Sequence, residues 1–193
     1  VLLAALAVYL VLSNLPDTGE LADYTPPLPS TVRAADGTVL TSYSRERRIF
    51  LPYKDMPPQL IHAYLSAEDK TFFTHAGLDY LGIAQAVLTN VKSMGSGKRP
   101  VGASTITQQV AKNLLLNNEV TFARKIKEAV LARRLEQALT KQQILELYLN
   151  QIFLGRNSYG VEAAAQAYFG KTVSQLDTAQ MAYLAILPKA PSN

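Results

Sequence analysis

The chain of 193 residues contains no cysteine. Disulfide bonds, thiolate nucleophiles and cysteine-ligated zinc are therefore excluded. Charged residues are few, at 18% of the chain against 48% apolar residues, which indicates a globular protein with a tendency toward membrane contact. Lys and Arg outnumber Asp and Glu by 19 to 15, and the resulting net charge of +4 suits an anionic surface or substrate.

Nucleotide-binding signatures are also missing. Neither a Walker loop nor a Gly-x-Gly-x-x-Gly fingerprint occurs in the sequence. Glycine-rich loops of these two kinds hold nucleotide phosphates at helix N-termini. Nucleotide binding is therefore unsupported, and we expect no nucleic acid among the partners.

The N-terminus is strongly apolar. Residues 1–12 form an unbroken apolar run, which is shorter than the roughly 20 residues needed to cross a bilayer. Because a polar, proline-rich stretch follows, we interpret residues 1–15 as the C-terminal part of a transmembrane anchor; a buried core helix is the alternative. The first residue is valine and not methionine, so we expect the chain to begin inside a longer protein.

Residues 16–50 predict a linker followed by a hairpin. Pro26, Pro27 and Pro29 lie in a stretch with little periodicity, as in an extended linker. Farther on, β-prone residues lie on both sides of Asp36-Gly37, a strong signal for a tight turn. We expect a short β-hairpin or a pair of edge strands there.

Residues 51–193 predict one mainly helical domain. Proline at position 57 or 58 can open a first helix, and apolar residues then recur at helical spacing toward Glu68. The same spacing predicts helices over residues 79–91, 104–116, 121–139, 141–150, 158–168 and 174–187. Two capping boxes are expected, Thr140 with Gln143 and Ser174 with Asp177. The Gly- and Lys-rich residues 92–100 predict a mobile loop between helices.

A first candidate for chemistry is the acidic pair Glu68-Asp69, which ends the first predicted helix. Aromatic Phe72 and His75 follow within one or two turns, and such surroundings can strip water from a carboxylate. A carboxylate of this kind can act as a general base on a sugar hydroxyl. The alternative is a solvated last turn of a helix with His75 held in the core.

A second candidate is a carboxylate among cations. Glu128 lies three residues after Lys125 and four after Arg124, so all three share one helix face. Lys112 precedes them on another predicted helix, and Arg133 lies farther along the helix that holds Glu128. Positive charge gathered in this way could neutralise a departing pyrophosphate. A surface helix with ordinary ion pairs is the alternative.

Two further segments carry polar residues. Residues 102–109 join the mobile loop to a helix start, and their hydroxyls, amides and free N–H groups would suit an anion or a sugar. Glu146, Tyr148 and Asn150 lie together near the end of the predicted helix 141–150. Either substrate contacts or hydrogen bonds that stabilise the fold would explain these three residues, and we favour the structural role.

Taken together, five segments resemble, in order, the motifs of the glycosyltransferase family 51 domain found in class A penicillin-binding proteins and monofunctional transglycosylases. The motifs read Glu68-Asp69-x-x-Phe72-x-x-His75-x-Gly77; Gly102-x-Ser104-Thr105-x-x-Gln108-Gln109, with Lys112-Asn113 after it; Arg124-Lys125-x-x-Glu128; Lys141-x-x-Ile144-Leu145-Glu146-x-Tyr148-Leu149-Asn150; and Ala182-x-Leu184-Ala185-x-Leu187-Pro188-x-Ala190-Pro191. The last departs from the family at Ile186, where glycine is usual. The resemblance covers roughly residues 51–192.

The resemblance implies a lysozyme-like, mainly α fold with a second, membrane-facing lobe called the jaw. It also implies an inverting reaction. Glu68 would deprotonate the 4-hydroxyl of the acceptor N-acetylglucosamine, and that oxygen would attack the anomeric carbon of the lipid-linked N-acetylmuramic acid. Undecaprenyl pyrophosphate would leave.

The resemblance further implies the supporting residues. Glu128, the second catalytic carboxylate, would hold or assist the pyrophosphate together with Lys112, Arg124 and Lys125. Substrate binding would also involve Asp69, Phe72, His75, Ser104, Thr105, Gln109 and Asn113. No cofactor is required by this scheme and no protein metal site is expected, although a divalent cation, Mg²⁺ or Mn²⁺, is an option at the pyrophosphate.

The expected partners are lipid II, the lipid-linked glycan chain and the membrane, with other cell-wall synthesis proteins as further candidates. The expected location is the bacterial cytoplasmic membrane, crossed once, with the catalytic domain on its periplasmic or extracellular face. Lys92, Lys98 and Arg99 could meet anionic lipid headgroups there, or remain solvated loop cations.

Three alternatives follow from these motifs. A muramidase would also use a catalytic glutamate in a lysozyme-like fold, but a hydrolase has no pyrophosphate to hold. A catalytically idle scaffold is disfavoured because both carboxylates are present. Finally, the transpeptidase motifs Ser-x-x-Lys, Ser-x-Asn and Lys-Thr-Gly are absent from these residues, so we expect a fragment of a bifunctional parent in preference to a monofunctional enzyme.

Overall fold

The computed structural model describes residues 15, 30–37, 39–43, 47–95, 97, 100–116 and 121–189. Apart from Leu15, the predicted anchor over residues 1–15 lies outside these residues, as do Pro26, Pro27 and Pro29 of the linker and Lys98 and Arg99 of the loop. Within the described part of the chain, no helix has both the length and the apolar character needed to span a membrane.

The described residues form two compact units. One is Glu68–Ile144, and the other combines the described parts of Asp23–Ala67 with those of Leu145–Asn193. The described chain holds seven α-helices and four short strands, so the predicted mainly helical class is confirmed. Each unit is taken by itself below.

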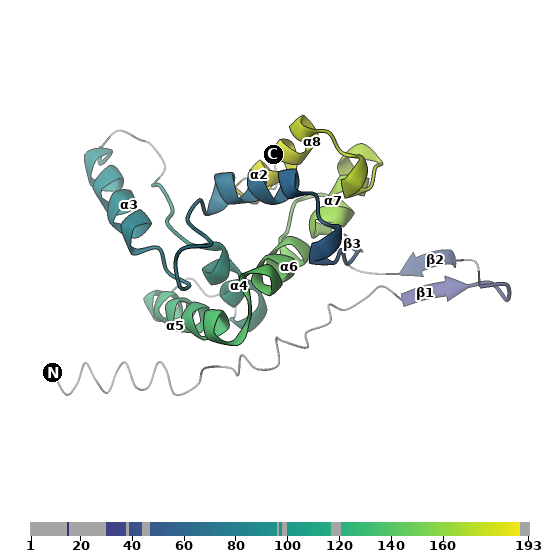
Figure 1. Cartoon of the computed structure of the whole chain (residues 1–193), viewed down its shortest axis with the longest axis horizontal. Helices are drawn as coiled ribbons and strands as arrows, with labels where there is room; N and C mark the ends of the chain where they lie inside the picture. The colour runs from purple at the N-terminus through teal and green to yellow at the C-terminus, as the bar shows by residue number, and fades with distance from the viewer. Residues whose placement is uncertain are drawn as a thin grey trace. The chain divides into compact units, whose positions relative to one another are not determined.

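The unit Glu68–Ile144 contains helices α3 (Tyr80–Lys92), α4 (Ile106–Leu115) and α5 (Phe122–Ala138), together with the start of α6 (Lys141–Gln151). Helices α4 and α5 lie side by side (Figure 1). Val110 and Ala111 of α4, and Leu131 and Leu135 of α5, are buried in the core. Each of these four residues has another buried residue three or four positions away on its own helix. This spacing places the buried residues in one stripe that faces the core.

Side-chain caps start the three complete helices of this unit. The carboxylate of Asp79 accepts a hydrogen bond from the Gly82 N–H (2.9 Å) at the start of α3. Thr105 and Gln108 form a capping box at α4, and the Thr121 hydroxyl accepts from the Arg124 N–H at α5. These caps satisfy N–H groups that have no partner inside the helix, and they explain why α3 to α5 begin within two residues of the predicted positions.

The second unit contains all of α2 (Pro58–Glu68) except its last residue, and the part of α6 from Leu145 onward. Its other elements are β1 (Ser30–Arg33), β2 (Val39–Tyr43), β3 (Arg47–Arg48), η2 (Tyr53–Asp55), β4 (Ser158–Tyr159), α7 (Val161–Phe169), η3 (Val173–Gln175), α8 (Thr178–Ile186) and η4 (Leu187–Lys189). Strands β1 and β2 pair antiparallel around the Asp36-Gly37 turn, with Ser30 opposite Tyr43 (Figure 1). Strands β3 and β4 form a separate, parallel pair.

Asn150 binds the segment before α2. Its side-chain Oδ1 accepts from the Leu51 N–H (2.8 Å), and its Nδ2 donates to the Leu51 carbonyl (2.9 Å). Nearby, the carboxylate of Glu146 accepts from the Tyr53 N–H (2.6 Å). Tyr148 is buried and meets the Tyr64 ring edge-on at 6.1 Å between centroids. The structural role favoured for Glu146, Tyr148 and Asn150 is therefore confirmed.

The structure corrects two predicted helices. Residues 158 and 159 form strand β4, and α7 starts at Val161, because Gly160 has φ +84° and lies too close to the Asn150 carbonyl for a side chain. The predicted helix 174–187 is a 3-10 turn followed by α8. Its capping box is wrong as well: Asp177 is itself the N-cap and pairs with Gln180, whereas the box of Thr140 and Gln143 is confirmed.

The cap of α3 predicts a pH-dependent stability. The pKa of Asp79 is lowered from its ordinary value of 3.8 by the hydrogen bond from the Gly82 N–H and then by that from the Thr71 hydroxyl. Because the folded pKa is below the unfolded one, the cap contributes fully above the unfolded pKa and its contribution is lost as the pH falls through the folded pKa. We expect hydrogen-exchange protection of the first α3 amides, corrected for intrinsic rates, to be lower at about pH 3 than at about pH 5, with the loss confined to pH values below the ordinary pKa of 3.8.

Two variants control this measurement. Asp79→Ala should weaken the start of α3 by about 1 kcal/mol at neutral pH. Asp79→Asn should keep most of the cap but lose the acid dependence. If the first α3 amides of the unchanged chain were equally protected at about pH 5 and about pH 3, the capping role of the Asp79 carboxylate would be contradicted.

Candidate active site

Glu68 is the last residue of α2 and reaches the first turns of α4. Its Oε2 accepts a hydrogen bond from the Gln109 Nε2 at 3.0 Å. Both residues are partly buried, and the Oε1 of Glu68 has almost no exposed surface. A partly exposed carboxylate fixed in orientation by an amide is in a suitable state to accept a proton from a hydroxyl group.

Asp69, next in the chain, has a different environment. It is buried, and its carboxylate contacts the His75 Nε2 (3.0 and 3.1 Å) and accepts from the Ile106 N–H (2.9 Å). The Gly77 N–H donates to the His75 Nδ1 at 3.1 Å. Because Nδ1 accepts, the ring proton must be on Nε2, and the imidazole donates to Asp69 as a neutral group. Asp69 thereby joins the 69–77 turn to the start of α4.

Thr105 is also committed to the fold. Its buried hydroxyl donates to the Gly77 carbonyl (2.7 Å) and accepts from the Gln108 N–H (3.1 Å), while its own N–H donates to the Gln108 side chain (3.0 Å). The Ile106 N–H is taken by Asp69. The expectation that free N–H groups of residues 102–109 form an anion cradle is therefore wrong for these three amides, because capping uses them.

Glu128 is the buried carboxylate of the site. Its side chain is 1% exposed, and its Oε2 contacts the Lys125 Nζ at 2.6 Å while its Oε1 lies 3.3 Å from the Arg124 Nε. The second pair lacks hydrogen-bond geometry, so the Arg124 Nε and the Glu128 Oε1 keep hydrogen-bonding capacity within the described residues. Lys125 is 50% exposed and also donates to the Ser104 hydroxyl at 3.2 Å. The predicted ion pairs on this helix face are thus present.

The two glutamates meet the same short segment. Gln109 contacts Glu68, and Ser104 contacts Lys125, which in turn holds Glu128. Segment 104–109 therefore contacts the partly buried acid Glu68 directly, and it contacts the buried acid Glu128 through Lys125. The arrangement brings a proton acceptor and an anion-binding group to one place.

The remaining predicted residues divide into two kinds. Lys112 and Asn113 follow Gln109 by three and four residues on α4, so they extend the same helix face. Phe72 is fully buried and meets the His75 ring edge-on, with 6.0 Å between ring centroids. In this conformation the Phe72 side chain has no exposed surface and supports the His75 ring, and its binding role stays a prediction.

Sequence reasoning missed Lys141 and Glu136. The Lys141 Nζ donates to the His75 carbonyl and to the Glu136 carboxylate, each at 2.7 Å, and lies 4.4 Å from the centre of the Phe72 ring. Glu136 also accepts from the Thr107 hydroxyl at 2.7 Å. Lys141 opens the fourth motif, but a lysine in a first helical turn resembles an ordinary surface cation, and only the fold brings the 69–77 turn to it.

A resident metal ion does not fit this site. Across the described ranges, no three His, Asp or Glu side chains are grouped as metal ligands would be. The positive charges beside Glu128 are instead the side chains of Arg124 and Lys125. Those two cations already compensate the carboxylate that a metal would need.

Comparison with known proteins defines the class. The family model described as Transglycosylase matches residues 36–193, and the chain belongs to this family. The chain is 49% identical over 188 residues to penicillin-binding protein 1A of Rickettsia prowazekii (strain Madrid E), covering 97% of this chain and 24% of that protein. It is 48% identical over 190 residues to penicillin-binding protein 1A of Neisseria cinerea, covering 98% and 23%. The chain thus spans about a quarter of the length of these relatives.

Among solved structures, that of penicillin-binding protein 1A from Haemophilus influenzae aligns with 88% of this chain and 15% of its own, at 28% identity and a TM-score of 0.39.

The contacts of Lys141 generate a stability prediction. Replacing Lys141 with Met keeps the length of the side chain but removes the hydrogen bonds to the His75 carbonyl and to Glu136. We expect the free energy of unfolding to fall by about 2 kcal/mol, since a mostly buried carboxylate loses its cation. Urea denaturation measures this change. Lys54→Met, at an exposed position, is the matched control, and equal effects of both substitutions would refute a role for this network.

Proposed function

We propose that the chain is a peptidoglycan glycosyltransferase that polymerises lipid II into glycan strands, with inversion and release of undecaprenyl pyrophosphate. Its membership of the transglycosylase family supports this function. The observation that carries it is the pairing of one partly buried acid held by an amide, Glu68, with one fully buried acid between cations, Glu128, around residues 104–109.

On the acceptor side, Glu68 acts as general base. Its carboxylate takes the proton from the 4-hydroxyl of N-acetylglucosamine as that oxygen forms a bond to the anomeric carbon of the donor. The hydrogen bond from Gln109 holds the Glu68 carboxylate in one orientation. The carboxylate oxygen that takes the proton is thereby kept near the reacting atoms.

On the donor side, the bond from the anomeric carbon to the pyrophosphate oxygen breaks, and negative charge accumulates on the leaving group. Arg124 and Lys125 neutralise this charge, with Lys112 as a further cation, and Glu128 holds the first two in place. A muramidase has no pyrophosphate to stabilise, so the cation group favours the transferase.

Asp69, Thr105 and His75 act mainly as positioning residues. Their polar atoms bind one another and the start of α4, and this network fixes Glu68 and Gln109 relative to one another. Contacts of Ser104, Gln109 and Asn113 with the sugar belong to the same proposal. The reaction needs no resident cofactor, because a proton acceptor and two cations are supplied by side chains.

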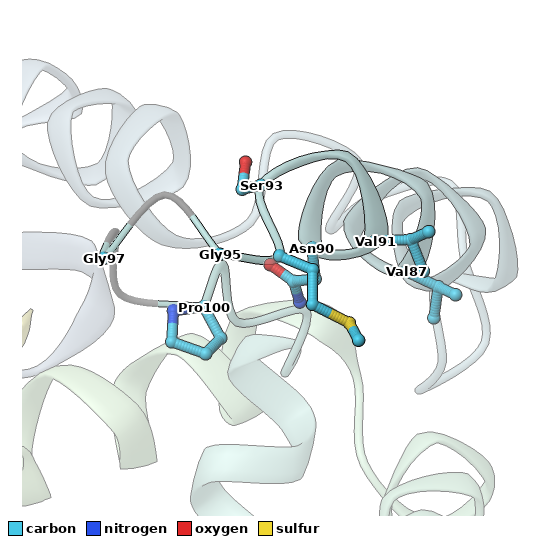
Figure 2. Close-up of a pocket in the computed structure, with 8 residues that line it drawn as sticks. Val87, Asn90, Val91, Ser93, Gly95, Gly97 and Pro100 are labelled. Atoms are coloured by element: carbon cyan, nitrogen blue, oxygen red, sulfur yellow. The ribbon is translucent and has the colours of Figure 1, made fainter.

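Contact with a membrane is part of the proposal. Helix α3 exposes large apolar side chains, with Tyr80 at 70% and Leu81 at 78% exposure, followed by Val87, Leu88 and Val91, and Met94 just beyond the helix is exposed as well. A hollow of about 580 Å³ lies at the end of this helix, and Figure 2 shows Val87 and Val91 of α3 and Pro100 of the following stretch around it. So large an exposed apolar surface is unusual for a soluble domain. It supports a jaw lobe that dips into the bilayer, where the substrate's prenyl chain resides.

We also propose how the chain is organised as part of a larger protein. Residues 1–15 are the end of a single transmembrane anchor, residues 16–50 are a linker with a hairpin, and residues 51–193 are the catalytic domain. The domain then lies on the periplasmic or extracellular face of the bacterial cytoplasmic membrane. Since the chain spans about a quarter of penicillin-binding protein 1A relatives, the parent is proposed to be bifunctional and to work with other cell-wall synthesis proteins.

Replacement of Glu68 by Gln tests the general base. Polymerisation of purified lipid II in detergent should fall by a factor of about 10² to 10⁴, since a general base contributes on this order. Circular dichroism should be unchanged, because Gln can keep the contact with Gln109. Asp55→Asn, which removes an exposed carboxylate, should polymerise normally.

Two outcomes of this experiment contradict the proposal. Full activity of Glu68→Gln would remove Glu68 as the base. Shortening of preformed glycan without any polymer from lipid II would identify a hydrolase.

Replacement of Lys125 by Met tests the donor side. The variant loses the cation 2.6 Å from Glu128, and the rate of polymerisation should fall about a hundredfold because one preorganised charge is missing. Inhibition by inorganic pyrophosphate should weaken in parallel. If the rate falls but pyrophosphate inhibits the variant as strongly as the unchanged chain, Lys125 does not contact the leaving group.

A further inference from the structure

The outer face of α5 carries a second hollow that the proposed reaction does not use. It has a volume of about 270 Å³ and is lined by Leu78 and by residues of α5, namely Ala129, Val130, Arg133, Arg134 and Gln137. At 3.6 residues per turn, Val130 and Gln137 point to the side of the helix opposite Glu128. The hollow is therefore separate from the cation group of the active site.

The wall formed by Leu78 is held firmly in place. Gly77, with φ +93°, lies so close to α5 that a Cβ atom there would be 2.9 Å from the Ala132 carbonyl. The Thr105 hydroxyl fixes the Gly77 carbonyl from the other side at 2.7 Å. Because glycine permits this approach, Leu78 runs alongside α5, and together with Ala129 and Val130 it forms an apolar floor.

Two guanidinium groups border this floor. Arg133 and Arg134 are exposed, and no ion pair joins either of them to an acidic residue within the described part of the chain. The situation differs from that of Arg124, Lys125 and Lys141, each of which has a carboxylate partner. Exposed arginines on a helix are commonly only solvated, but here both lie beside an apolar hollow. An amphiphile with an anionic head and a hydrocarbon tail complements that combination.

The hollow is also close in sequence to the apolar surface of α3. Leu78 precedes the highly exposed Tyr80 and Leu81 by two and three residues. Under the proposed function this surface enters the bilayer, so the hollow lies where membrane lipids are at high local concentration. The inference that follows rests on that membrane contact.

We propose that this hollow is a binding site for an anionic diacyl phospholipid of the membrane. Arg133 and Arg134 bind the phosphodiester, and part of one acyl chain lies over Leu78, Ala129 and Val130. The bound lipid orients the outer face of α5 toward the bilayer and is neither substrate nor product.

Vesicle binding tests the charged half of the site. The chain is titrated with vesicles of dioleoyl phosphatidylcholine, pure or with dioleoyl phosphatidylglycerol added. The double variant Arg133→Gln with Arg134→Gln should bind the anionic vesicles at least about tenfold more weakly, since each cation near an anionic surface contributes substantially. The control, Lys54→Gln with Lys70→Gln, removes the same charge at exposed positions and should lose less than about threefold. If both double variants lost the same affinity for anionic vesicles, net charge alone would explain the effect, and this result would contradict the proposed site.

Two further variants test the apolar half of the site. Ala129→Phe fills the hollow without changing the charge, and Val130→Thr makes its floor polar at nearly constant volume. Native mass spectrometry from detergent should detect one retained phosphatidylglycerol on the unchanged chain and a severalfold lower occupancy on either variant. Unchanged occupancy, or equal retention of soluble glycerol phosphate, would overturn the acyl-chain contact.

Activity separates this proposal from the proposed function. In detergent without added phospholipid, the double arginine variant should polymerise lipid II at the rate of the unchanged chain, while Glu68→Gln does not. Loss of polymerisation in the arginine variant would place these residues in the reaction and overturn the peripheral site. Retained activity of Glu68→Gln would instead overturn the proposed catalysis and leave the vesicle result unaffected.

Discussion

The geometry of the unit Glu68–Ile144 depends on the contacts of the buried Asp69 carboxylate. This carboxylate binds the His75 ring and the first N–H of α4, so it attaches a turn and a helix to the end of α2. A buried charge without partners is costly, and this cost disfavours any arrangement in which the turn or the helix moves away. Glu68 precedes Asp69 directly, and Gln109 follows Ile106 by three residues. The contact between Glu68 and Gln109 is therefore a consequence of the one made by Asp69.

The two glutamates illustrate how environment assigns different roles to one residue type. Glu68 is partly exposed and bound by a neutral amide, so it can exchange a proton with an incoming hydroxyl. Glu128 is buried and compensated by Lys125 and Arg124, so its main effect is to organise positive charge. Burial beside cations makes an acid a structural anion, whereas partial exposure leaves it available for chemistry.

Helix α5 serves three purposes. The inner face carries Arg124 and Glu128 near the start of the helix and the buried Leu131 and Leu135 farther along it, and the outer face carries the hollow with its two arginines. A regular helix presents residues in all directions at fixed angles, so chemistry, stability and surface contact can be specified almost independently along one segment. This separation explains why α5 has little amphipathic contrast in its sequence although its core face is completely buried.

The sequence alone determined the helical class, the order of the helices and most of their starts, because apolar spacing and capping residues act over a few positions. It also identified Glu68 and the group around Glu128, since the contacts within that group are local to one helix. Only the tertiary structure decided that the α4 amides are already occupied, that Phe72 is core, and that Lys141 and Glu136 secure the 69–77 turn. It also showed that Ser158 and Tyr159 form a strand, where the sequence predicted a helix. The contacts of the Ile106 N–H, of Glu136 with Thr107, of Lys141 with His75 and of β3 with β4 join groups 29 to 111 positions apart, and local patterns contain no information on which distant groups meet.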